Sequence, residues 1–337
     1  MRLLLTGGAG FIGHHVVEHF LKNTDWEIII LEGFNYAGIL KRIVDISIFG
    51  KEADRIRFVY HDIRAEVPLM LHRQIGHLDY VIHMAAETHV DRSLEDPITF
   101  YRTNVMGTAH ILEYCRKYQP MLKKYIQVST DEVYGAAPFG IDYKEWDRMK
   151  PSNPYSAGKA GGDMAVIGNT IAFGMPCMIT RSMNNFGERQ DIEKFIPKTI
   201  QAIMKGMPVV LHGNPQKGQI SSRKWLHARN HADAILFLLE NGKPINKNTD
   251  DGIYNIVGDE MNVLEVAEYI GKILGKTEEE YMIEWLDFHK TRIGHDLRYS
   301  LDGSKLAAMG WKAPIPLLQS LEKTIKWSLE NKEWLQL

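Results

Sequence analysis

The chain has 337 residues, of which 45% are hydrophobic and 24% are charged. This composition is ordinary for a soluble globular protein, and the length allows two lobes with a large core. Lys and Arg (40) nearly balance Asp and Glu (42), so the net charge of -2 creates no global field that would attract nucleic acid or a membrane. No apolar run reaches the roughly 18–20 residues of a membrane span. We therefore expect a cytoplasmic protein with two reduced cysteines, Cys115 and Cys177.

A glycine-rich turn follows the first predicted strand, residues 2–5. The pattern Gly8-x-Gly10-x-x-Gly13 precedes a predicted helix over residues 14–22, and it is the dinucleotide fingerprint. Its glycines let the backbone approach a pyrophosphate, which the helix N-terminus would face. A second predicted strand, residues 26–31, ends in Glu32, where a carboxylate binds the adenosine ribose and favours NAD over NADP. We therefore expect an NAD site that includes Gly7, Gly10, Phe11, Ile12, Gly13 and Glu32.

Further strands and helices alternate through the first half of the chain. Apolar runs predict strands at residues 57–60 and 80–84, and the spacing of apolar residues predicts a helix over 104–118. Ala85 and Ala86 follow the fourth strand, where small side chains let a cofactor pass closely. This order of elements predicts an α/β fold with a Rossmann-type doubly wound parallel sheet.

The chemistry is expected at two neighbouring stretches. Apolar residues 125–128 predict a buried strand, whose carboxyl end carries Thr130, Asp131 and Glu132. Tyr155 and Lys159 lie in the next predicted helix, where residues four apart share one face. An ammonium near a phenol lowers the phenol's pKa from about 10, which yields a general base for a hydroxyl. The two carboxyls could lie in a capped, solvated turn, but beside this pair they predict a second proton transfer.

The regular alternation of predicted strands and helices ends after residue 188. Residues 195–205 predict a helix, 209–211 a strand, 216–224 a polar basic loop, 231–239 a helix and 252–256 a strand. His15 and His19 share a helical face but lack a third ligand, so no metal site is predicted. We expect an NAD-binding Rossmann domain over residues 1–180, with a returning piece at about 231–257, and a smaller C-terminal substrate-binding lobe over 181–337.

Together these motifs resemble the extended short-chain dehydrogenase/reductases, and within them the nucleotide-sugar 4,6-dehydratases. The dTDP-glucose 4,6-dehydratases are the nearest match, and the similarity runs nearly end to end. It is carried by Thr6-Gly-Gly-Ala-Gly-Phe-Ile-Gly13, Tyr36-Ala37-Gly38, Ala85-Ala-Glu-Thr-His-Val-Asp-Arg-Ser93, Thr103-Asn-Val105, Ser129-Thr-Asp-Glu-Val-Tyr-Gly135, Pro154-Tyr-Ser-Ala-Gly-Lys159, Asn184-Asn185-Phe186-Gly187 and Arg292-Ile-Gly-His-Asp-Leu-Arg-Tyr299. The Thr-Asp-Glu triplet is the most specific, because related epimerases usually carry small or hydroxyl residues there.

The resemblance implies conversion of an NDP-hexose to NDP-4-keto-6-deoxyhexose plus water, with dTDP-glucose or UDP-glucose as the expected substrate. Tyr155 would take the O4 proton while NAD⁺ takes the C4 hydride, and Lys159 would lower the tyrosine's pKa and contact the nicotinamide ribose. Glu132 would remove the C5 proton, Asp131 would protonate the departing C6 hydroxyl, and Thr130 would hydrogen-bond O4. The hydride would then return to C6. The resemblance also places Asp62, Ile63 and Thr103 at the cofactor.

For the substrate, the resemblance points to Asn184, Lys194, Phe195, Arg223, Asn255, Arg292 and His295. Amide and guanidinium groups suit diphosphate oxygens, whereas Lys194 and Phe195 would approach the base. The chain departs from the family at Glu32 (usually Asp), His212 (commonly Tyr) and Ile293 (usually Pro). Because these departures surround the nucleotide and sugar, the base and the hexose stay open. The alternative is a 4-epimerase, or a dehydratase of another NDP-sugar such as UDP-N-acetylglucosamine.

The resemblance further implies a homodimer, in which helices that begin near Asn104 and Tyr155 form a four-helix bundle. The small residues Gly158, Ala160, Gly161 and Gly162 would permit close helix contact, although they could equally serve packing within one subunit. An inactive NAD-sensing module is a different class of protein. It predicts loss of Tyr155 or Lys159, and both are present.

Overall fold

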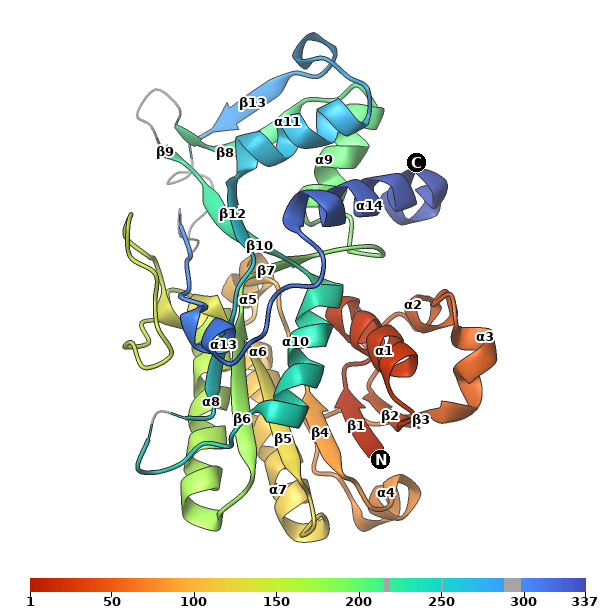
Figure 1. Ribbon diagram of the computed structural model, residues 1–337, viewed down its shortest axis with the longest axis vertical. Helices are drawn as coiled ribbons and strands as arrows, with labels where there is room; N and C mark the ends of the chain where they lie inside the picture. Colours follow the sequence, from red (N-terminus) through yellow and green to blue (C-terminus); the bar gives the residue numbers. More distant parts are fainter. Residues whose placement is uncertain (215–218, 250, 288–297) are drawn as a thin grey trace.

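Figure 1 shows the computed structural model, which describes residues 1–214, 219–249, 251–287 and 298–337. Within these ranges a seven-stranded sheet forms the larger part of the molecule, in the order β11-β6-β5-β4-β1-β2-β3. The order changes direction between β1 and β4, which is the switch point at which such sheets bind ligands. All neighbours pair in parallel, so the predicted doubly wound sheet is confirmed. The strands are β1 (Arg2–Thr6), β2 (Glu27–Glu32), β3 (Ile56–Tyr60), β4 (Tyr80–His83), β5 (Lys124–Thr130), β6 (Cys177–Ser182) and β11 (Ile253–Ile256).

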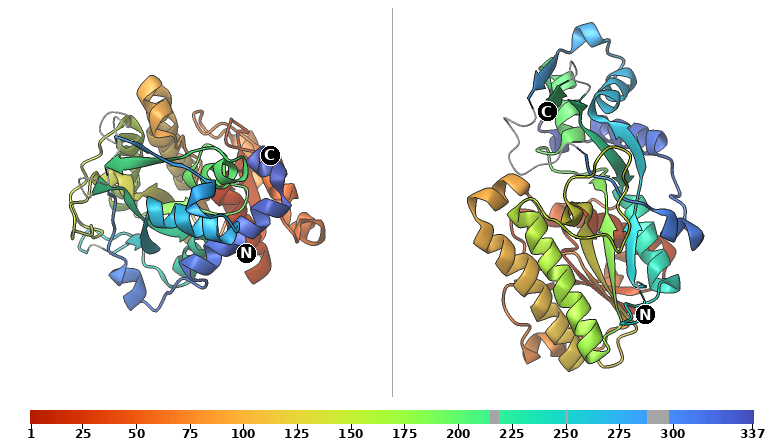
Figure 2. Two further views of the ribbon diagram at one scale, coloured as in Figure 1. Left: turned by 90° about the horizontal axis from the view of Figure 1, so that it is seen from above. Right: turned by 90° about the vertical axis from the view of Figure 1, so that its left-hand side faces the viewer.

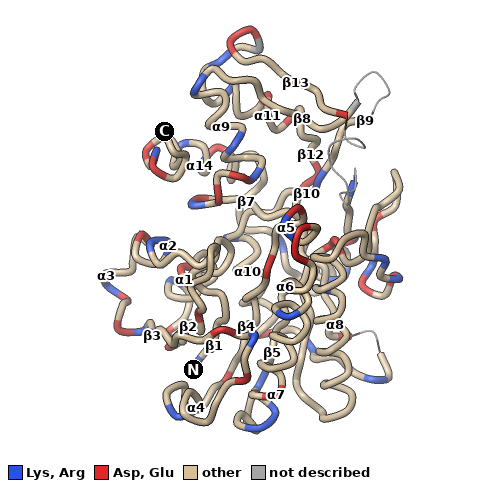
Figure 3. Tube along the Cα trace, turned by 180° about the vertical axis from the view of Figure 1, so that it is seen from behind, with Lys and Arg blue, Asp and Glu red and all other residues tan. Residues whose placement is uncertain are grey.

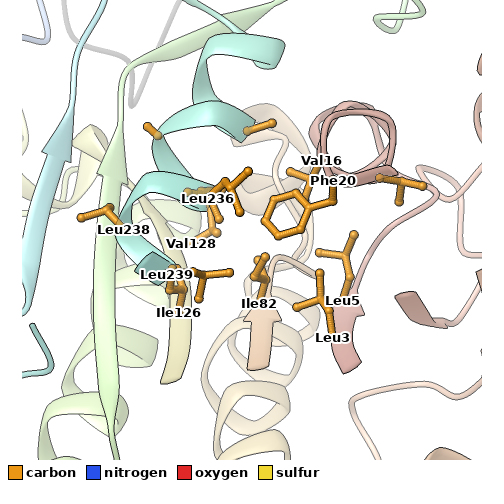
Figure 4. Close-up of a cluster of buried hydrophobic side chains, with 14 of the residues drawn as sticks. Leu3, Leu5, Val16, Phe20, Ile82, Ile126, Val128, Leu236, Leu238 and Leu239 are labelled. Carbon is orange, nitrogen blue, oxygen red and sulfur yellow. The ribbon is translucent and has the colours of Figure 1, made fainter. Parts of the chain in front are cut away.

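Helices cover both faces of this sheet because its strands are apolar on both sides. Along β1, Leu3 and Leu5 face one layer of helices and Leu4 faces the other, and all are fully buried. Figure 4 shows Leu3 and Leu5 gathered with Val16 and Phe20 of the first helix. That layer contains α1 (Phe11–Asn23), α2 (Leu40–Val44), α3 (Phe49–Glu52), α10 (Ala228–Asn241) and α13 (Ser304–Ala308). The opposite layer contains α4 (Leu69–Ile75), α7 (Thr108–Tyr118) and α8 (Pro154–Phe173), with α5 (Val90–Glu95) and α6 (Pro97–Tyr101) against the start of α8.

The helix predicted over residues 104–118 is interrupted at its start. Residues Arg102–Gly107 form a π-helical turn, labelled η2, and regular α-helix begins only with α7. Apolar periodicity does not reveal such a turn, because it changes the backbone pairing without removing the apolar positions. π-Helical turns are frequent at functional sites, and this one borders the cavity described below.

A smaller lobe lies over the carboxyl edge of the large sheet (Figures 1 and 2). In the part of the chain that the structure describes, it holds two three-stranded sheets, β12-β10-β7 and β13-β8-β9. Its core includes Phe186, Ile200, Trp225, Ile270 and Leu321. The elements are β7 (Asn184–Phe186), α9 (Phe195–Met204), β8 (Val209–Asn214), β9 (Gln219–Ile220), β10 (Ser222–His227), β12 (Asp259–Asn262), α11 (Val263–Ile273), β13 (Ile283–Leu286), α14 (Leu317–Glu330) and the short 3-10 helix η6 (Lys332–Leu335).

The prediction of a polar loop over residues 216–224 is wrong for those of its residues that the structure describes. Residues Gln219–Ile220 form β9, and β10 begins at Ser222. Arg223 and Trp225 are buried along β10, which pairs with β12 on one side and β7 on the other. Tertiary pairing thus overrides the polar composition of this stretch.

The chain returns to the large sheet after entering the smaller lobe. α10 packs against α1, and β11 pairs with β6 through Ile253 and Ile179. We propose the domain division stated above, with α10 and β11 as the returning piece, and the layering in Figure 2 supports it. α13 departs from this division, because it packs against β11 in the helix layer of the large sheet. Positive and negative residues are interspersed along the trace in both lobes (Figure 3). None of the described helices combines the length and apolar character needed to cross a bilayer.

Candidate active site

A cavity of about 460 Å³ lies between the carboxyl edge of the large sheet and the smaller lobe. It borders the switch point between β1 and β4, where the strand order predicts a ligand site. The predicted cofactor and catalytic residues all line it: Gly7, Gly10, Phe11, Ile12, Gly13, Glu32, Asp62, Ile63, Ala85, Ala86, Thr103, Thr130, Asp131, Glu132, Tyr155 and Lys159. Residues spread over more than 150 positions of sequence are thus gathered around one space.

The glycine-rich turn is packed too tightly for side chains. A Cβ on Gly13 would lie 2.2 Å from the Gly7 carbonyl oxygen, and a Cβ on Gly7, whose φ is +73°, would lie 2.9 Å from the backbone of Ala85. Helix α1 starts here with Gly10 as its N-cap, and no side-chain cap or acidic residue of the first turn occupies its amides among the described residues. An uncapped helix N-terminus beside bare backbone suits a pyrophosphate.

Glu32 ends β2 with its carboxylate buried at the cavity wall. Its Oε2 accepts from the Ala9 amide at 3.0 Å, and its Oε1 accepts from the amides of Gly33 and Phe34 at 3.1 and 3.3 Å. Burial raises the pKa of Glu32, whereas these hydrogen bonds lower it. The buried hydroxyl of Thr103, which lines the same cavity, has no partner among the described residues. The turn, the acid and the hydroxyl fit a dinucleotide.

The π-helical turn η2 holds the loop after β4. The Asn104 side chain accepts from the Glu87 amide at 2.9 Å and donates to the Glu87 carbonyl at 3.0 Å. Cβ atoms added to Gly158 and Gly162 of α8 would lie 3.3 Å from Asn104 Cβ and 2.7 Å from its carbonyl oxygen. These glycines therefore pack within one subunit, which is the second of the two roles considered for them.

Helix α8 places Tyr155 and Lys159 at the cavity. Asn153 caps it by accepting from the Ser156 amide at 2.8 Å, and Pro154 occupies its first turn. Lys159 Nζ donates to the Val128 carbonyl at 2.6 Å, and burial lowers the pKa of Lys159 to about 8 while Asp163 raises it. The ammonium is thus anchored to the strand that carries the two carboxyl groups.

In the protein alone, Tyr155 is held in its neutral form. Burial raises the pKa of the phenol above its usual range, and the charge of Glu132 raises it further. A hydrogen bond with the Thr130 hydroxyl acts in the opposite direction. Lys159 is not among the groups that act most strongly on this pKa. The lowering expected from its ammonium, and with it the phenolate form of Tyr155, therefore stays a prediction for the protein with its ligands.

Asp131 and Glu132 are neighbours in sequence but lie in different environments. Thr130 Oγ1 donates to Asp131 Oδ1 at 2.8 Å, while the buried Oδ2 has no partner among the described residues. Asp131 is 5% exposed, and burial raises its pKa to about 6. Glu132 is half-buried and accepts from Asn153 Nδ2 at 3.5 Å. Adjacent carboxyl groups with unlike surroundings suit one proton donor and one proton acceptor.

The predicted substrate residues are divided by the structure. Asn184, Lys194, Phe195 and Arg223 line the cavity on the side of the smaller lobe. The Arg223 guanidinium lies 4.9 Å from the centre of the Tyr299 ring, and Phe195 stacks on Trp225 with ring centroids 5.7 Å apart. Asn184 Oδ1 is buried without a partner among the described residues, which leaves an acceptor for a ligand. Arg292 and His295 lie outside the described residues.

Asn255 does not fit its predicted role as a diphosphate ligand. It is fully buried on β11, and its amide donates to the carbonyls of Tyr143 and Asp302 at 3.0 and 3.2 Å. It lines a separate, smaller cavity of about 240 Å³. Its side chain joins two segments of the fold, so we remove it from the substrate-binding set.

Several cavity residues were not identified from the sequence. Tyr36, Gln190, Ser221 and Tyr299 line the same cavity, and the Arg92 guanidinium lies 3.9 Å from the centre of the Tyr36 ring. Tyr36 stands in the Tyr-Ala-Gly motif, which was a usable signal. Gln190 donates to the Asn185 carbonyl at 2.9 Å, and no local sequence pattern predicts this contact.

Comparison with known proteins agrees with this geometry. Residues 4–324 match the family model described as GDP-mannose 4,6 dehydratase. The chain belongs to this family. The dTDP-glucose 4,6-dehydratase of Salmonella typhimurium is 34% identical over 357 aligned positions, which cover 99% of this chain and 94% of that protein. A trifunctional UDP-glucose 4,6-dehydratase of Arabidopsis thaliana is also 34% identical, over 98% of this chain and 48% of that larger protein.

Solved structures of nucleotide-sugar enzymes have the same fold. A double mutant of the dTDP-glucose 4,6-dehydratase of Streptomyces venezuelae, with NAD bound, has a TM-score of 0.86 at 33% identity and covers 99% of this chain and 98% of that chain. The UDP-glucose 4-epimerase of Thermus thermophilus, also with NAD, has a TM-score of 0.80 at 26% identity, with coverages of 97% and 98%. The predicted family, fold and NAD-dependent nucleotide-sugar 4,6-dehydratase class are confirmed.

Proposed function

We propose that the protein converts a nucleoside-diphosphate glucose, dTDP-glucose or UDP-glucose, to the 4-keto-6-deoxy sugar and water. The observation that carries this proposal is the pair Asp131 and Glu132, two adjacent carboxyl groups of unlike burial in the cavity that holds Tyr155. An epimerase only rotates its 4-keto intermediate within the site, so it needs no second acid and base. The pair therefore favours elimination of water over epimerisation.

The first step removes the proton of the sugar's O4 hydroxyl and a hydride from C4. Tyr155 accepts the O4 proton as a phenolate, and the Thr130 hydroxyl, already bonded to Tyr155, hydrogen-bonds O4. Lys159 supplies the positive charge behind this pair, from an ammonium fixed to the Val128 carbonyl. When bound, NAD⁺ accepts the C4 hydride and later returns it to C6, so the cycle ends without net oxidation.

The second step uses the two carboxyl groups in opposite directions. A ketone at C4 makes the C5 proton acidic, and the carboxylate of Glu132 removes it. Asp131, whose pKa is raised to about 6, is the group more readily held as the neutral acid, and it gives its proton to the C6 hydroxyl. Water leaves, a C5=C6 double bond forms, and after hydride addition at C6 Glu132 returns a proton to C5.

The substrate's nucleotide is proposed to lie against the smaller lobe. The guanidinium of Arg223 and the side-chain N–H groups of Asn184 can donate to diphosphate oxygens, while the stacked Phe195 and Trp225 rings offer an apolar wall for a base. Identity does not choose the base, because the dTDP-glucose and UDP-glucose relatives are both 34% identical to the chain. The base must therefore be identified by measuring which nucleotide sugar the protein converts.

The test is incubation of the purified protein with dTDP-, UDP-, GDP- and CDP-hexoses and with UDP-N-acetylglucosamine in D₂O, followed by mass spectrometry. We expect one sugar to lose water and gain one solvent deuterium at C5. Deuterium uptake without loss of water would contradict the role of Asp131. An isomer of unchanged mass without deuterium would instead establish a 4-epimerase.

We also propose that the protein is a homodimer in the cytoplasm. α6, η2 and α8 pack together and leave a group of large apolar side chains exposed to solvent, namely Ile98, Tyr101, Met106, Met164 and Ile171. Large apolar side chains left exposed on helices that pack together suit a protein interface, which supports the proposed dimer. The buried free thiols Cys115 and Cys177 suit a reducing compartment, which cell fractionation would test.

A further inference from the structure

Arg42 is a fully buried arginine whose guanidinium joins segments on both sides of the cavity. It stands on α2, and its side chain is 0% exposed. Nη1 donates to the Ala37 carbonyl at 2.7 Å, Nε donates to the Arg189 carbonyl at 3.0 Å, and Nη2 donates to Asp191 Oδ1 at 2.7 Å. The Trp334 ring lies 5.8 Å away and helps to seal the group from water.

The Ala37 contact belongs to the cofactor side of the cavity. Ala37 and Gly38 line the cavity beside Glu32, and a Cβ on Gly38 would lie 2.8 Å from Glu32 Oε1. The Ile39 amide donates to the Ala9 carbonyl at 3.0 Å, which ties the same loop to the glycine-rich turn. Arg42 thus holds the loop that packs on the proposed ribose-binding acid.

The contacts to Arg189 and Asp191 belong to the substrate side. Gln190 and Asp191 line the cavity between the predicted substrate residues Asn184 and Lys194. The Lys194 amide donates to the Asp191 carbonyl at 3.0 Å, and Gln190 Nε2 donates to the Asn185 carbonyl at 2.9 Å. A shift of this segment would therefore move both ends of the proposed nucleotide-binding wall.

Only a guanidinium can make these contacts together. Its planar fork directs separate N–H groups to partners in different directions, whereas a lysine ammonium is a single point of charge on a flexible stem. A buried cation is costly to leave unpaired, so the two segments and the guanidinium are stable only as an assembled set. Ordering one segment then favours the order of the other.

We propose that Arg42 is a positioning residue that couples NAD binding to nucleotide-sugar binding. The inference rests on the proposed function, since it takes NAD and a nucleoside diphosphate as the two ligands. It adds that each ligand tightens the other through Ala37, Arg42 and Asp191, without either ligand touching the guanidinium. Coupling of this kind is reciprocal by thermodynamic necessity.

The test measures binding of dTDP and UDP by calorimetry to the NAD-loaded and the NAD-depleted protein. The wild type is expected to bind the preferred diphosphate at least about 5-fold more tightly when NAD is present, the lower end for coupled sites. Arg42→Lys keeps the charge but loses the fork, and we expect the ratio to fall to about 1. Asp191→Ala removes the carboxylate partner and should lower the ratio in the same way.

Arg55→Lys is the matched control. Arg55 also ties backbone carbonyls together, donating to Leu21, Thr24 and Trp26 at 3.0, 2.6 and 3.2 Å, but it does not border the cavity. A structural loss alone would lower thermal stability in Arg42→Lys and Arg55→Lys alike, whereas only the former should lose the coupling. An Arg42→Lys protein that keeps the wild-type ratio would overturn the inference, and so would a wild type that binds both ligands independently. A wild type that binds NAD but no nucleoside diphosphate would overturn the proposed function itself, and the inference with it.

Discussion

At the scale of single residues, the site depends on what surrounds two adjacent carboxyl groups. Asp131 is buried beside Thr130 with one oxygen left without a partner among the described residues, whereas Glu132 is half-buried next to Asn153. The types and order of these residues could be read from the sequence because they are contiguous. Their unlike surroundings could not be read from the sequence, because they depend on segments distant in the chain. One of these is Arg223 in the smaller lobe, whose charge lowers the pKa of Asp131.

Asp131→Asn should lower kcat and raise stability at the same time. The folded pKa of Asp131, about 6, lies above its usual 3.8, so this group's contribution to stability is full below pH 3.8 and is lost as pH rises through 6. Removing the buried charge should therefore stabilise the protein by up to about 3 kcal/mol at pH 8 and by little at pH 4. Turnover should fall about 10²–10⁴-fold. Urea unfolding at both pH values measures the first effect, and an equal difference at both would contradict the assignment.

Tyr155→Phe should remove turnover while leaving the cofactor in place. The phenol oxygen, as phenolate, is the proposed acceptor of the O4 proton, whereas the ring packs with Val90 and Phe100, the latter with ring centroids 6.4 Å apart. We expect kcat to fall about 10²–10⁴-fold, as for loss of a general base. NAD content, read by absorbance after denaturation, should match the wild type. Full activity in the variant would show that another group takes the proton.

At the scale of elements, close packing between α8 and η2 positions the chemistry. Gly158 and Gly162 let α8 approach Asn104, which holds Glu87 and so the loop after β4. The sequence predicts α8 well, since Pro154 and a capping asparagine mark its start. It does not predict η2, because a helical period of apolar residues is equally satisfied by an α-helix and by one interrupted by a π turn.

Gly162→Ala should destabilise the protein and loosen the cofactor. Its Cβ would lie 2.7 Å from the Asn104 carbonyl oxygen, so α8 and η2 must separate, at a cost of about 1–3 kcal/mol. Gly50→Ala is the control, because nothing lies within 4 Å of a Cβ at this exposed helical position. That change should stabilise by about 0.5–1 kcal/mol. Denaturant unfolding and retained NAD are the measurements, and similar effects of both variants would refute the packing argument.

At the scale of the whole molecule, the site is completed by contacts between distant segments. The seven-stranded sheet within the described ranges and its switch point follow from alternating strands and helices, which local patterns reveal. Arg42 and Arg189 are 147 positions apart and meet only because the smaller lobe folds over the sheet. Pairings of this kind leave no local periodicity. For the same reason Asn255 could be assigned to the substrate by resemblance while it actually joins Tyr143 and Asp302.

The proposed dimer predicts a single-residue disruption. Met164 and Ile171 are exposed on the outer side of α8. Ile171→Glu would bury a charge in the interface, so sedimentation at micromolar concentration should change from dimer to monomer. Met282→Glu alters an exposed apolar residue on the smaller lobe and should leave the dimer intact. A wild-type protein that sediments as a monomer would contradict the proposal.

The late arrival of β11 has a consequence for how the chain is made on the ribosome. β11 supplies the outer neighbour of β6, and it is synthesised only after about three quarters of the chain. Until then β6, which pairs with the strand carrying Thr130, presents an open edge to other nascent chains. A chain stalled before residue 253 would hold every predicted catalytic residue and still be prone to edge-to-edge aggregation. Slow translation between β6 and β11 should therefore cost yield of folded protein, and a chaperone that covers strand edges should restore it.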